Sequence, residues 1–216
     1  MSSIFHQNPP IPRREHMRKE KLFNNDWLFI DKQIPLGTPD EFFQAINLPH
    51  SNKLFKHFNI DNQEYQFIST YRKKFEIEKP EGQNVILQFD GVMVACEVYL
   101  NGIKISEHKG GFINFDVDLT KFLRDGDNTL DVYVDSNERK DIPPFGQLVD
   151  YLTFGGIYRD VWLKILPPTS LRHVFIQPEK VLIKPSLNCR VELNEYQPGL
   201  SLKTKLLNQE NELVLE

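Results

Sequence analysis

A period-2 alternation of apolar and other residues through positions 94–100 is the clearest pattern in this chain. Val94, Cys96, Val98 and Leu100 alternate with Ala95, Glu97 and Tyr99. This spacing places the first set on one face of a β-strand. The strand stops at Asn101-Gly102, and apolar residues resume over 103–105. Because Asn and Gly tolerate positive φ angles, the sequence predicts a β-hairpin with a type I′ turn.

Further strands are expected on both sides of this hairpin. Phe115, Val117 and Leu119 alternate with aspartates, and the same period returns over 130–134. A long strand with apolar residues on both faces is predicted for 157–166, and it ends at Pro167-Pro168. Residues 38–45 carry a proline and two acids where a first turn would lie, which favours at most one short helix. The pattern therefore predicts an all-β fold.

The prolines at 167–168 predict a boundary, and a second all-β unit is expected beyond them. Its strands are predicted at 171–176, 181–193, 200–207 and 213–215, with a hairpin turn at 208–211. The resulting organisation is an N-terminal arm over 1–26, a domain over 27–168 and the start of another over 169–216. The second unit is expected to be incomplete, because the sequence finishes inside an apolar strand with no closing turn.

Composition supports a packed domain and excludes some partners. Of the 216 residues, 40% are hydrophobic and 12% aromatic, which suits a β-sandwich core. The formal net charge is −4 with both signs interspersed, so we expect no broad attraction to nucleic acid or membrane. Cys96 and Cys189 are far apart and are expected to be buried or semi-buried thiols. The first residues lack the apolar segment of a signal peptide, which favours the cytoplasm.

The sequence carries no motif for nucleophilic, nucleotide-dependent or zinc chemistry, and its six histidines are scattered. The loop acids Asp135, Glu138 and Asp141 are interpreted as solvated charges. Asp150 differs, because it lies in an otherwise apolar segment over 148–154, where a bare carboxylate is costly unless it is hydrogen-bonded or binds a cation.

Four aromatic residues follow Asp150 and could present flat faces to a sugar. Tyr151 and Phe154 lie on the loop, where a functional role is favoured. Tyr158 and Trp162 lie in the predicted strand, so packing is the preferred interpretation for them.

A series of short segments, in fixed order, resembles the N-terminal sugar-binding jelly roll of glycoside hydrolase family 2. The segments are Asn47-Leu48-Pro49-His50, Tyr71-Arg72-Lys73-Lys74-Phe75, Phe89-Asp90-Gly91-Val92, Val98-Tyr99-Leu100-Asn101-Gly102, Gly110-Gly111-Phe112, Phe115-Asp116-Val117-Asp118-Leu119-Thr120 and Gly156-Ile157-Tyr158-Arg159-Asp160-Val161. The resemblance covers about residues 27–168, and the remainder resembles the start of that family's immunoglobulin-like domain. It implies a jelly-roll-type β-sandwich followed by a partial immunoglobulin-like β-sandwich.

The resemblance also implies where chemistry would take place. The family's two catalytic glutamates lie on a (β/α)₈ barrel, so no catalytic residue is expected in this chain, and the fragment alone is expected to be inactive. Asp150 matches a loop aspartate that contacts a sugar hydroxyl at the non-reducing end and in some β-galactosidases helps to hold a monovalent cation. Asp150 and Tyr151 are therefore the expected substrate-binding residues.

The resemblance favours an accessory domain of a retaining exo-glycosidase, a β-galactosidase before a β-glucuronidase or a β-mannosidase. No cofactor is expected to be required, although a monovalent cation or Mg²⁺ could belong to the full-length enzyme. The expected partners are a β-linked sugar, bound through the barrel, and further copies in a homo-oligomer. Two alternatives stay open: a free-standing carbohydrate-binding module, and a purely structural or oligomerisation domain.

Overall fold

The computed structural model describes residues 18–54, 64–143, 145–146, 153–195 and 197–215. Its contacts separate the chain into two units, Met1–Pro167 and Pro168–Glu216, which we describe in turn. The described residues contain no α-helix, and one 3-10 turn, η1 (Asp40–Phe42), is described in full. This turn occupies the place of the short helix expected over 38–45, and the all-β prediction is confirmed. No helix of the described part has the length and apolar character needed to cross a bilayer.

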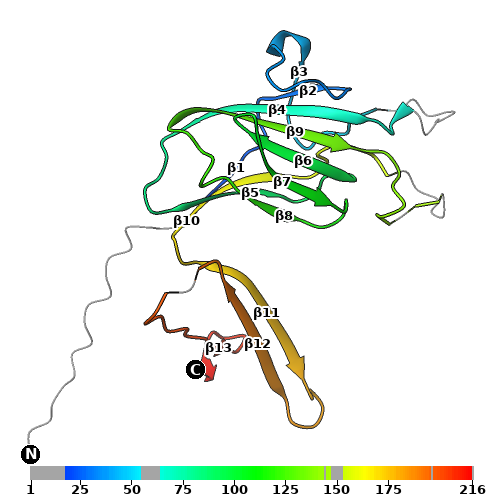
Figure 1. Ribbon diagram of the computed structural model, residues 1–216. Helices are drawn as coiled ribbons and strands as arrows, with labels where there is room; N and C mark the ends of the chain where they lie inside the picture. Colours follow the sequence, from blue (N-terminus) through cyan, green and yellow to red (C-terminus); the bar gives the residue numbers. More distant parts are fainter. Residues whose placement is uncertain (1–17, 55–63, 144, 147–152, 196, 216) are drawn as a thin grey trace, which may run out of the picture. The chain divides into compact units, whose positions relative to one another are not determined.

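Two antiparallel sheets form the first unit and lie face to face as layers (Figure 1). The six-stranded sheet has the order β3-β2-β4-β9-β6-β7. Its strands, in chain order, are β2 (Trp27–Ile30), β3 (Gln44–Ile46), β4 (Ile68–Ile77), β6 (Ala95–Leu100), β7 (Ile103–Lys109) and β9 (Gly126–Asp135). The four-stranded sheet has the order β1-β10-β5-β8. It consists of β1 (Lys19–Leu22), β5 (Asn84–Phe89), β8 (Phe115–Asp118) and β10 (Val161–Leu166). Neighbours such as β4 and β9 are distant in sequence, as expected for a β-sandwich of the jelly-roll type.

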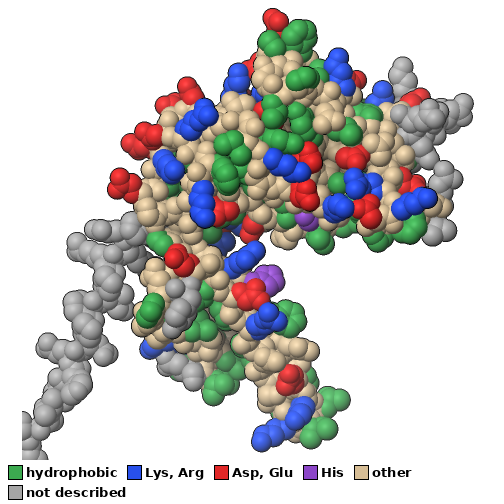
Figure 2. Space-filling model, in the orientation of Figure 1, with side chains coloured by type: hydrophobic (Ala, Val, Ile, Leu, Met, Phe, Trp, Pro, Cys, Tyr) green, Lys and Arg blue, Asp and Glu red, His purple; other side chains and the backbone are tan. Residues whose placement is uncertain are grey.

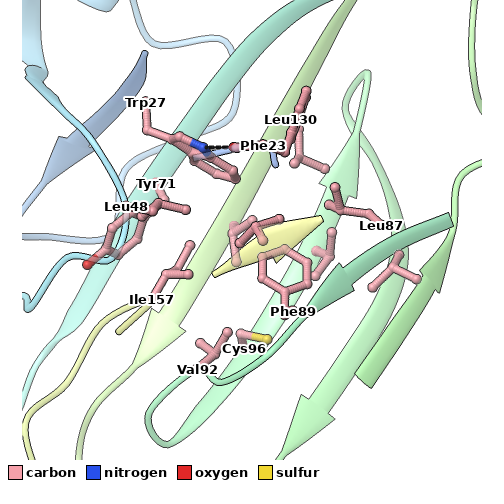
Figure 3. Packing of buried hydrophobic residues seen from close by; sticks show 14 of the residues in the cluster. Phe23, Trp27, Leu48, Tyr71, Leu87, Phe89, Val92, Cys96, Leu130 and Ile157 are labelled. Atoms are coloured by element: carbon pink, nitrogen blue, oxygen red, sulfur yellow. Dashed lines mark hydrogen bonds between the residues drawn. The ribbon is translucent and has the colours of Figure 1, made fainter. Parts of the chain in front are cut away.

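The core lies between the sheets and is built by the alternation that the sequence shows. Leu87 and Phe89 of β5 face Cys96 and Leu130 of the other sheet, and all four are buried (Figure 3). The indole nitrogen of Trp27 is also buried and donates to the carbonyl of Phe23 at 2.7 Å. Burial of apolar side chains at roughly 25 cal/mol per Å² is the main force that holds two such sheets together.

The turn between β6 and β7 confirms the predicted hairpin. Asn101 has φ 52° and Gly102 has φ 83°, as a type I′ turn requires. The side-chain oxygen of Asn101 also accepts a hydrogen bond from the Thr129 amide at 3.0 Å. A short polar side chain therefore fixes both the turn and its contact with β9.

Two boundaries differ from expectation. Residues 19–22, expected in a loose arm, form β1 and pair with β10. The sequence gives no sign of this strand because all four side chains are exposed at a sheet edge. The strand expected over 157–166 begins only at Val161. Before it, backbone groups bond elsewhere: the Ile157 carbonyl accepts from His50, and the Asp160 carbonyl accepts from Asp90.

A segment over residues 31–43 is fastened to the outer face of the six-stranded sheet by Arg72. The guanidinium of Arg72 pairs with Asp131 at 2.7 Å and with Asp40 at 3.0 Å. Arg72 and Asp131 are both buried. Burial raises the pKa of Asp131, while the hydrogen bond from Arg72 opposes that shift. The hydroxyl of Tyr133 adds a hydrogen bond to the Ile34 carbonyl at 2.7 Å. The segment is therefore held by polar bonds as well as by packing.

The second unit consists of two short antiparallel pairs. β11 (Leu171–Glu179) pairs with β12 (Ser186–Leu193), and β13 (Leu206–Leu207) pairs with β14 (Leu213–Leu215). The strand expected over 181–193 starts late because residues 180–184 form a turn, in which the amides of Ile183 and Lys184 donate to Lys180. Only the last two residues of the strand expected over 200–207, Leu206 and Leu207, belong to a strand. The predicted turn at 208–211 is confirmed by a bond from the Asn211 amide to Asn208.

The cysteines are free, as expected, but only one of them is buried. Cys96 lies in the core of the sandwich, and burial raises the pKa of its thiol to about 12. Cys189 is exposed on β12, which corrects the expectation of a buried or semi-buried thiol. The pairing of β11 with β12 shields the backbone of residue 189 and leaves its side chain open.

Candidate functional site

The predicted sugar-contacting residues, Asp150 and Tyr151, lie outside the described residues. Their flanks are described, and both belong to one end of the sandwich. β4 begins and β9 finishes there, since Ile68 pairs with Asp135, and β6 begins there as well. We call this end the loop end. The connections that leave it include those from Asn52 to Tyr65 and from Ser136 to Gly155.

The acids on the first flank form surface ion pairs. Arg139 contacts Asp135 at 3.1 Å and Asp141 at 3.1 Å, and Lys109 contacts Asp141 at 2.6 Å. These bonds hold the pKa of Asp141 well below its ordinary value. Glu138 accepts a hydrogen bond from the Gly146 amide. All of these contacts agree with the interpretation of solvated loop charges.

The second flank starts at two glycines that no other residue could replace without displacement. A Cβ on Gly155 would lie 2.0 Å from the Ser136 hydroxyl oxygen and 2.5 Å from the Asn52 amide nitrogen. Gly156 has φ 114°, and a Cβ there would lie 2.5 Å from the His50 carbonyl. Gly156 also bridges to Met93 through two backbone hydrogen bonds. Close approach of side chains at Gly155 and of backbone at Gly156 therefore favours glycine at both positions.

Residues 50–52 pair with this glycine segment. The His50 amide donates to the Ile157 carbonyl at 2.8 Å, and the Asn52 amide donates to the Gly155 carbonyl at 2.9 Å. The side chain of Asn52 then donates to the Tyr65 carbonyl at 2.9 Å. Sequence analysis singled out His50 within the family motif but missed Asn52, because an asparagine in a polar stretch gives no signal.

The side chain of His50 joins an aromatic cluster beneath the loops. Its Nδ1 lies 3.0 Å from the Tyr71 hydroxyl, and its ring lies 4.6 Å from the ring of Phe29. Burial lowers the pKa of His50, so the imidazole is neutral at pH 7 and can accept a hydrogen bond from Tyr71. Burial raises the pKa of Tyr71 far above its ordinary value. The pair is therefore a structural support with no charge to offer a ligand.

Three of the four aromatic residues that follow Asp150 in the sequence are described: Tyr158 and Trp162 have packing roles, and Phe154 is exposed. The Tyr158 hydroxyl donates to the Gly111 carbonyl at 2.6 Å, and the Trp162 indole donates to Asp90 at 3.0 Å. Both bonds agree with the interpretation that these side chains support the fold. Phe154 is 44% exposed. Two other residues near the loop end that sequence analysis did not weigh are exposed to a similar degree, Phe112 at 47% and Phe145 at 43%.

A groove of about 580 Å³ with both polar and apolar lining lies at the opposite end of the six-stranded sheet. Its lining is made of Leu36, Gly37, Thr38, Pro39, Asp40, Arg72, Lys74, Asn101, Gly102, Arg124, Thr129 and Asp131. None of these residues is aromatic, so the groove has no flat apolar surface for the face of a sugar ring. Figure 2 shows acidic and basic side chains interspersed over the side of the sandwich that faces the viewer.

Comparison with known proteins decides the family. The model of the glycosyl hydrolase 2 galactose-binding-like domain matches residues 47–145. The chain is 40% identical to a β-galactosidase of Thermoanaerobacter pseudethanolicus over 87% of its own length, and 37% identical to one of Thermoanaerobacterium thermosulfurigenes over 88%. This chain belongs to glycoside hydrolase family 2. Within the family it corresponds to the N-terminal domain of the glycosidases.

Solved structures of the family share the fold. A β-glucuronidase of Bacteroides uniformis superimposes with a TM-score of 0.69 at 28% identity, over 82% of this chain and 22% of that one. A structure titled putative β-galactosidase from Bacteroides fragilis gives 0.70 at 25%, over 91% of this chain and 32% of that one. The chain spans about a quarter of the β-galactosidases above, 26% and 28% of their lengths.

Proposed function

We propose that this chain is the N-terminal accessory domain of a retaining exo-glycosidase that hydrolyses terminal β-D-galactosides. The observation that carries the proposal is the 40% and 37% identity to two proteins named β-galactosidase, over nearly nine tenths of the chain. In the family that the chain resembles, the two catalytic glutamates are expected on a barrel domain, outside this chain. Because the described residues contain no α-helix, they contain no part of a (β/α)₈ barrel.

In this proposal the loop end supplies one wall of the sugar site. Asp150 would accept a hydrogen bond from a sugar hydroxyl, and Tyr151 would present its ring to the sugar. A hydrogen bond to a charged group contributes roughly 1.5–3 kcal/mol. Loss of such a bond corresponds to about 10- to 150-fold in binding. Asp150 would therefore select the substrate without taking part in bond cleavage.

A β-glucuronidase is the second candidate, because a protein named putative β-glucuronidase from Formosa agariphila is 34% identical over 76% of this chain. A free-standing carbohydrate-binding module is less well supported. No aromatic side chain lines the groove on the six-stranded sheet. Among the exposed phenylalanines of the sandwich, Phe112, Phe145 and Phe154 lie in connections at the loop end, and Phe42 and Phe122 lie within two residues of the groove lining.

We also propose a homo-oligomer and a cytoplasmic location for the whole enzyme. Two free thiols favour a reducing compartment. A monovalent cation or Mg²⁺ could assist sugar binding near Asp150. Within the described residues, no three His, Cys, Asp or Glu side chains are grouped to hold a metal, so no partner ligand can be named. The cation is therefore proposed on Asp150 alone.

The experiment compares hydrolysis of p-nitrophenyl β-galactoside, β-glucuronide and β-mannoside by the full-length gene product. The expected result is a galactoside preference, with kcat/KM at least tenfold lower in Asp150→Asn. The matched control is Asp141→Asn, a surface acid of the same connection that already has cationic partners. If Asp150→Asn and Asp141→Asn behave alike, Asp150 has no role in sugar recognition. If another sugar is preferred, the galactosidase proposal is wrong.

A further inference from the structure

Two connections at the loop end are closed at their bases, and the two closures touch each other. The connection from Asn52 to Tyr65 is closed by the Asn52 side chain, which donates to the Tyr65 carbonyl at 2.9 Å. The connection from Ser136 to Gly155 is closed because these residues are packed so tightly that a Cβ on Gly155 would meet Ser136 at 2.0 Å. The two bases are joined by the hydrogen bond from the Asn52 amide to the Gly155 carbonyl at 2.9 Å.

Further hydrogen bonds tie the junction of Asn52, Ser136 and Gly155 to Met93. The hydroxyl of Ser136 donates to the Met93 carbonyl at 3.1 Å, and Met93 bridges to Gly156. Asn52 is 5% exposed and Ser136 is 4% exposed, so water cannot replace these bonds readily. Buried polar side chains are hydrogen-bonded in most native structures. The junction therefore has few alternative arrangements.

Asn52 occupies the central place in this junction. Its backbone reaches one connection and its side chain closes the other. Its side-chain oxygen is buried and has no hydrogen-bond partner within the described part of the chain. The side-chain nitrogen of Asn52 makes the bond that closes the first connection, so an apolar residue at this position would remove that bond.

We propose that Asn52 is a positioning residue for sugar recognition, because it fixes the bases of both connections relative to each other. The inference rests on the proposed function, since the second connection carries Asp150. Asn52 does not need to touch the sugar. It acts through the Gly155 and Tyr65 carbonyls, and its replacement would let the two connections move independently.

The test uses Asn52→Ala and a matched control, Asn128→Ala. Asn128 is 2% exposed, and its side chain closes a turn by donating to the Arg124 and Gly126 carbonyls at 2.9 Å each. The control therefore removes a buried asparagine of similar structural importance at the other end of the six-stranded sheet. A loss of stability shared by the two variants carries no information about positioning.

The first measurement is amide hydrogen exchange of the 216-residue chain. We expect Asn52→Ala to accelerate exchange at least tenfold in the described bases of both connections, 64–67 and 136–143, and Asn128→Ala to leave both unchanged. Acceleration in 64–67 alone overturns the proposal, because the two connections would then be independent. Equal acceleration in both variants also overturns it.

The second measurement is the kinetics of the full-length enzyme with p-nitrophenyl β-galactoside. We expect Asn52→Ala to raise KM at least fivefold with a smaller change in kcat, and Asn128→Ala to change KM less than twofold. If exchange accelerates in both connections but KM is unchanged, the junction couples the two connections as argued, and its proposed role in sugar recognition is wrong. Failure of the proposed function differs from both results, because it appears as absent galactoside turnover in the unmodified enzyme.

Discussion

Replacement of Asp131 by Asn is expected to destabilise the sandwich by about 2–4 kcal/mol. The Asp131 side chain is 4% exposed in the middle of β9 and accepts from Arg72, which is 3% exposed, at 2.7 Å. Removing one partner from a buried ion pair costs roughly 3–5 kcal/mol, because a buried charge is left without compensation. We lower that range by about 1 kcal/mol, because Arg72 keeps its contact with Asp40 at 3.0 Å.

Urea unfolding followed by tryptophan fluorescence measures this change. Both tryptophans of the chain, Trp27 and Trp162, lie in the first unit, so the signal reports the sandwich alone. In thermal unfolding, a loss of about 3 kcal/mol corresponds to a decrease in Tm of about 6–12 °C for a domain of this size. The same tryptophan signal serves both experiments.

Two further variants make the reasoning refutable. The double variant Arg72→Met/Asp131→Leu replaces the pair by apolar side chains and should recover at least half of the loss. Lys104→Met breaks surface pairs with Glu97 and Glu107 and should leave the unfolding midpoint unchanged. If Asp131→Asn lies within about 0.5 kcal/mol of the unmodified chain, or the double variant is less stable than the single one, the buried pair does not stabilise the fold as argued.

Two other predictions concern the loop end. Gly156→Ala should cost about 3 kcal/mol or more, since strain at φ 114° adds to a backbone clash, whereas Gly102→Ala, with open space around it, should cost about 1 kcal/mol; equal losses in urea unfolding would contradict this. Burial lowers the pKa of His50, so the folded state favours the neutral imidazole. The contribution of His50 to the unfolding free energy is therefore complete above the unfolded pKa of 6.5 and is lost as pH falls through the lower folded pKa. Between pH 7 and 5, unfolding free energy should therefore fall more steeply in the unmodified chain than in His50→Gln, and parallel slopes would refute it.

Local patterns in the sequence determined much of the sandwich. The alternation over 94–100 and the turn residues Asn101-Gly102 are sufficient to predict β6, the hairpin and the burial of Val98 and Leu100. The reason is that strand periodicity and turn chemistry depend on neighbouring residues only. The same kind of signal predicted β8, β9 and the turn between β13 and β14.

Contacts between distant residues were decided only by the tertiary structure. β1 has no apolar pattern and exists because the edge of β10 offers backbone partners. The pairing of Arg72 with Asp131 joins residues 59 apart, and nothing local marks either side chain for burial.

The candidate site divides in the same way. A carboxylate in an apolar segment identified Asp150 from the sequence, because the cost of burying a charge can be recognised from its neighbours alone. The junction of Asn52 with Gly155 could not be recognised, since it depends on which connections the strand order brings together at the loop end. The sequence by itself thus determined several strands of the sandwich, the family resemblance and the candidate carboxylate, and the tertiary structure decided which backbone segments support the connection that carries it.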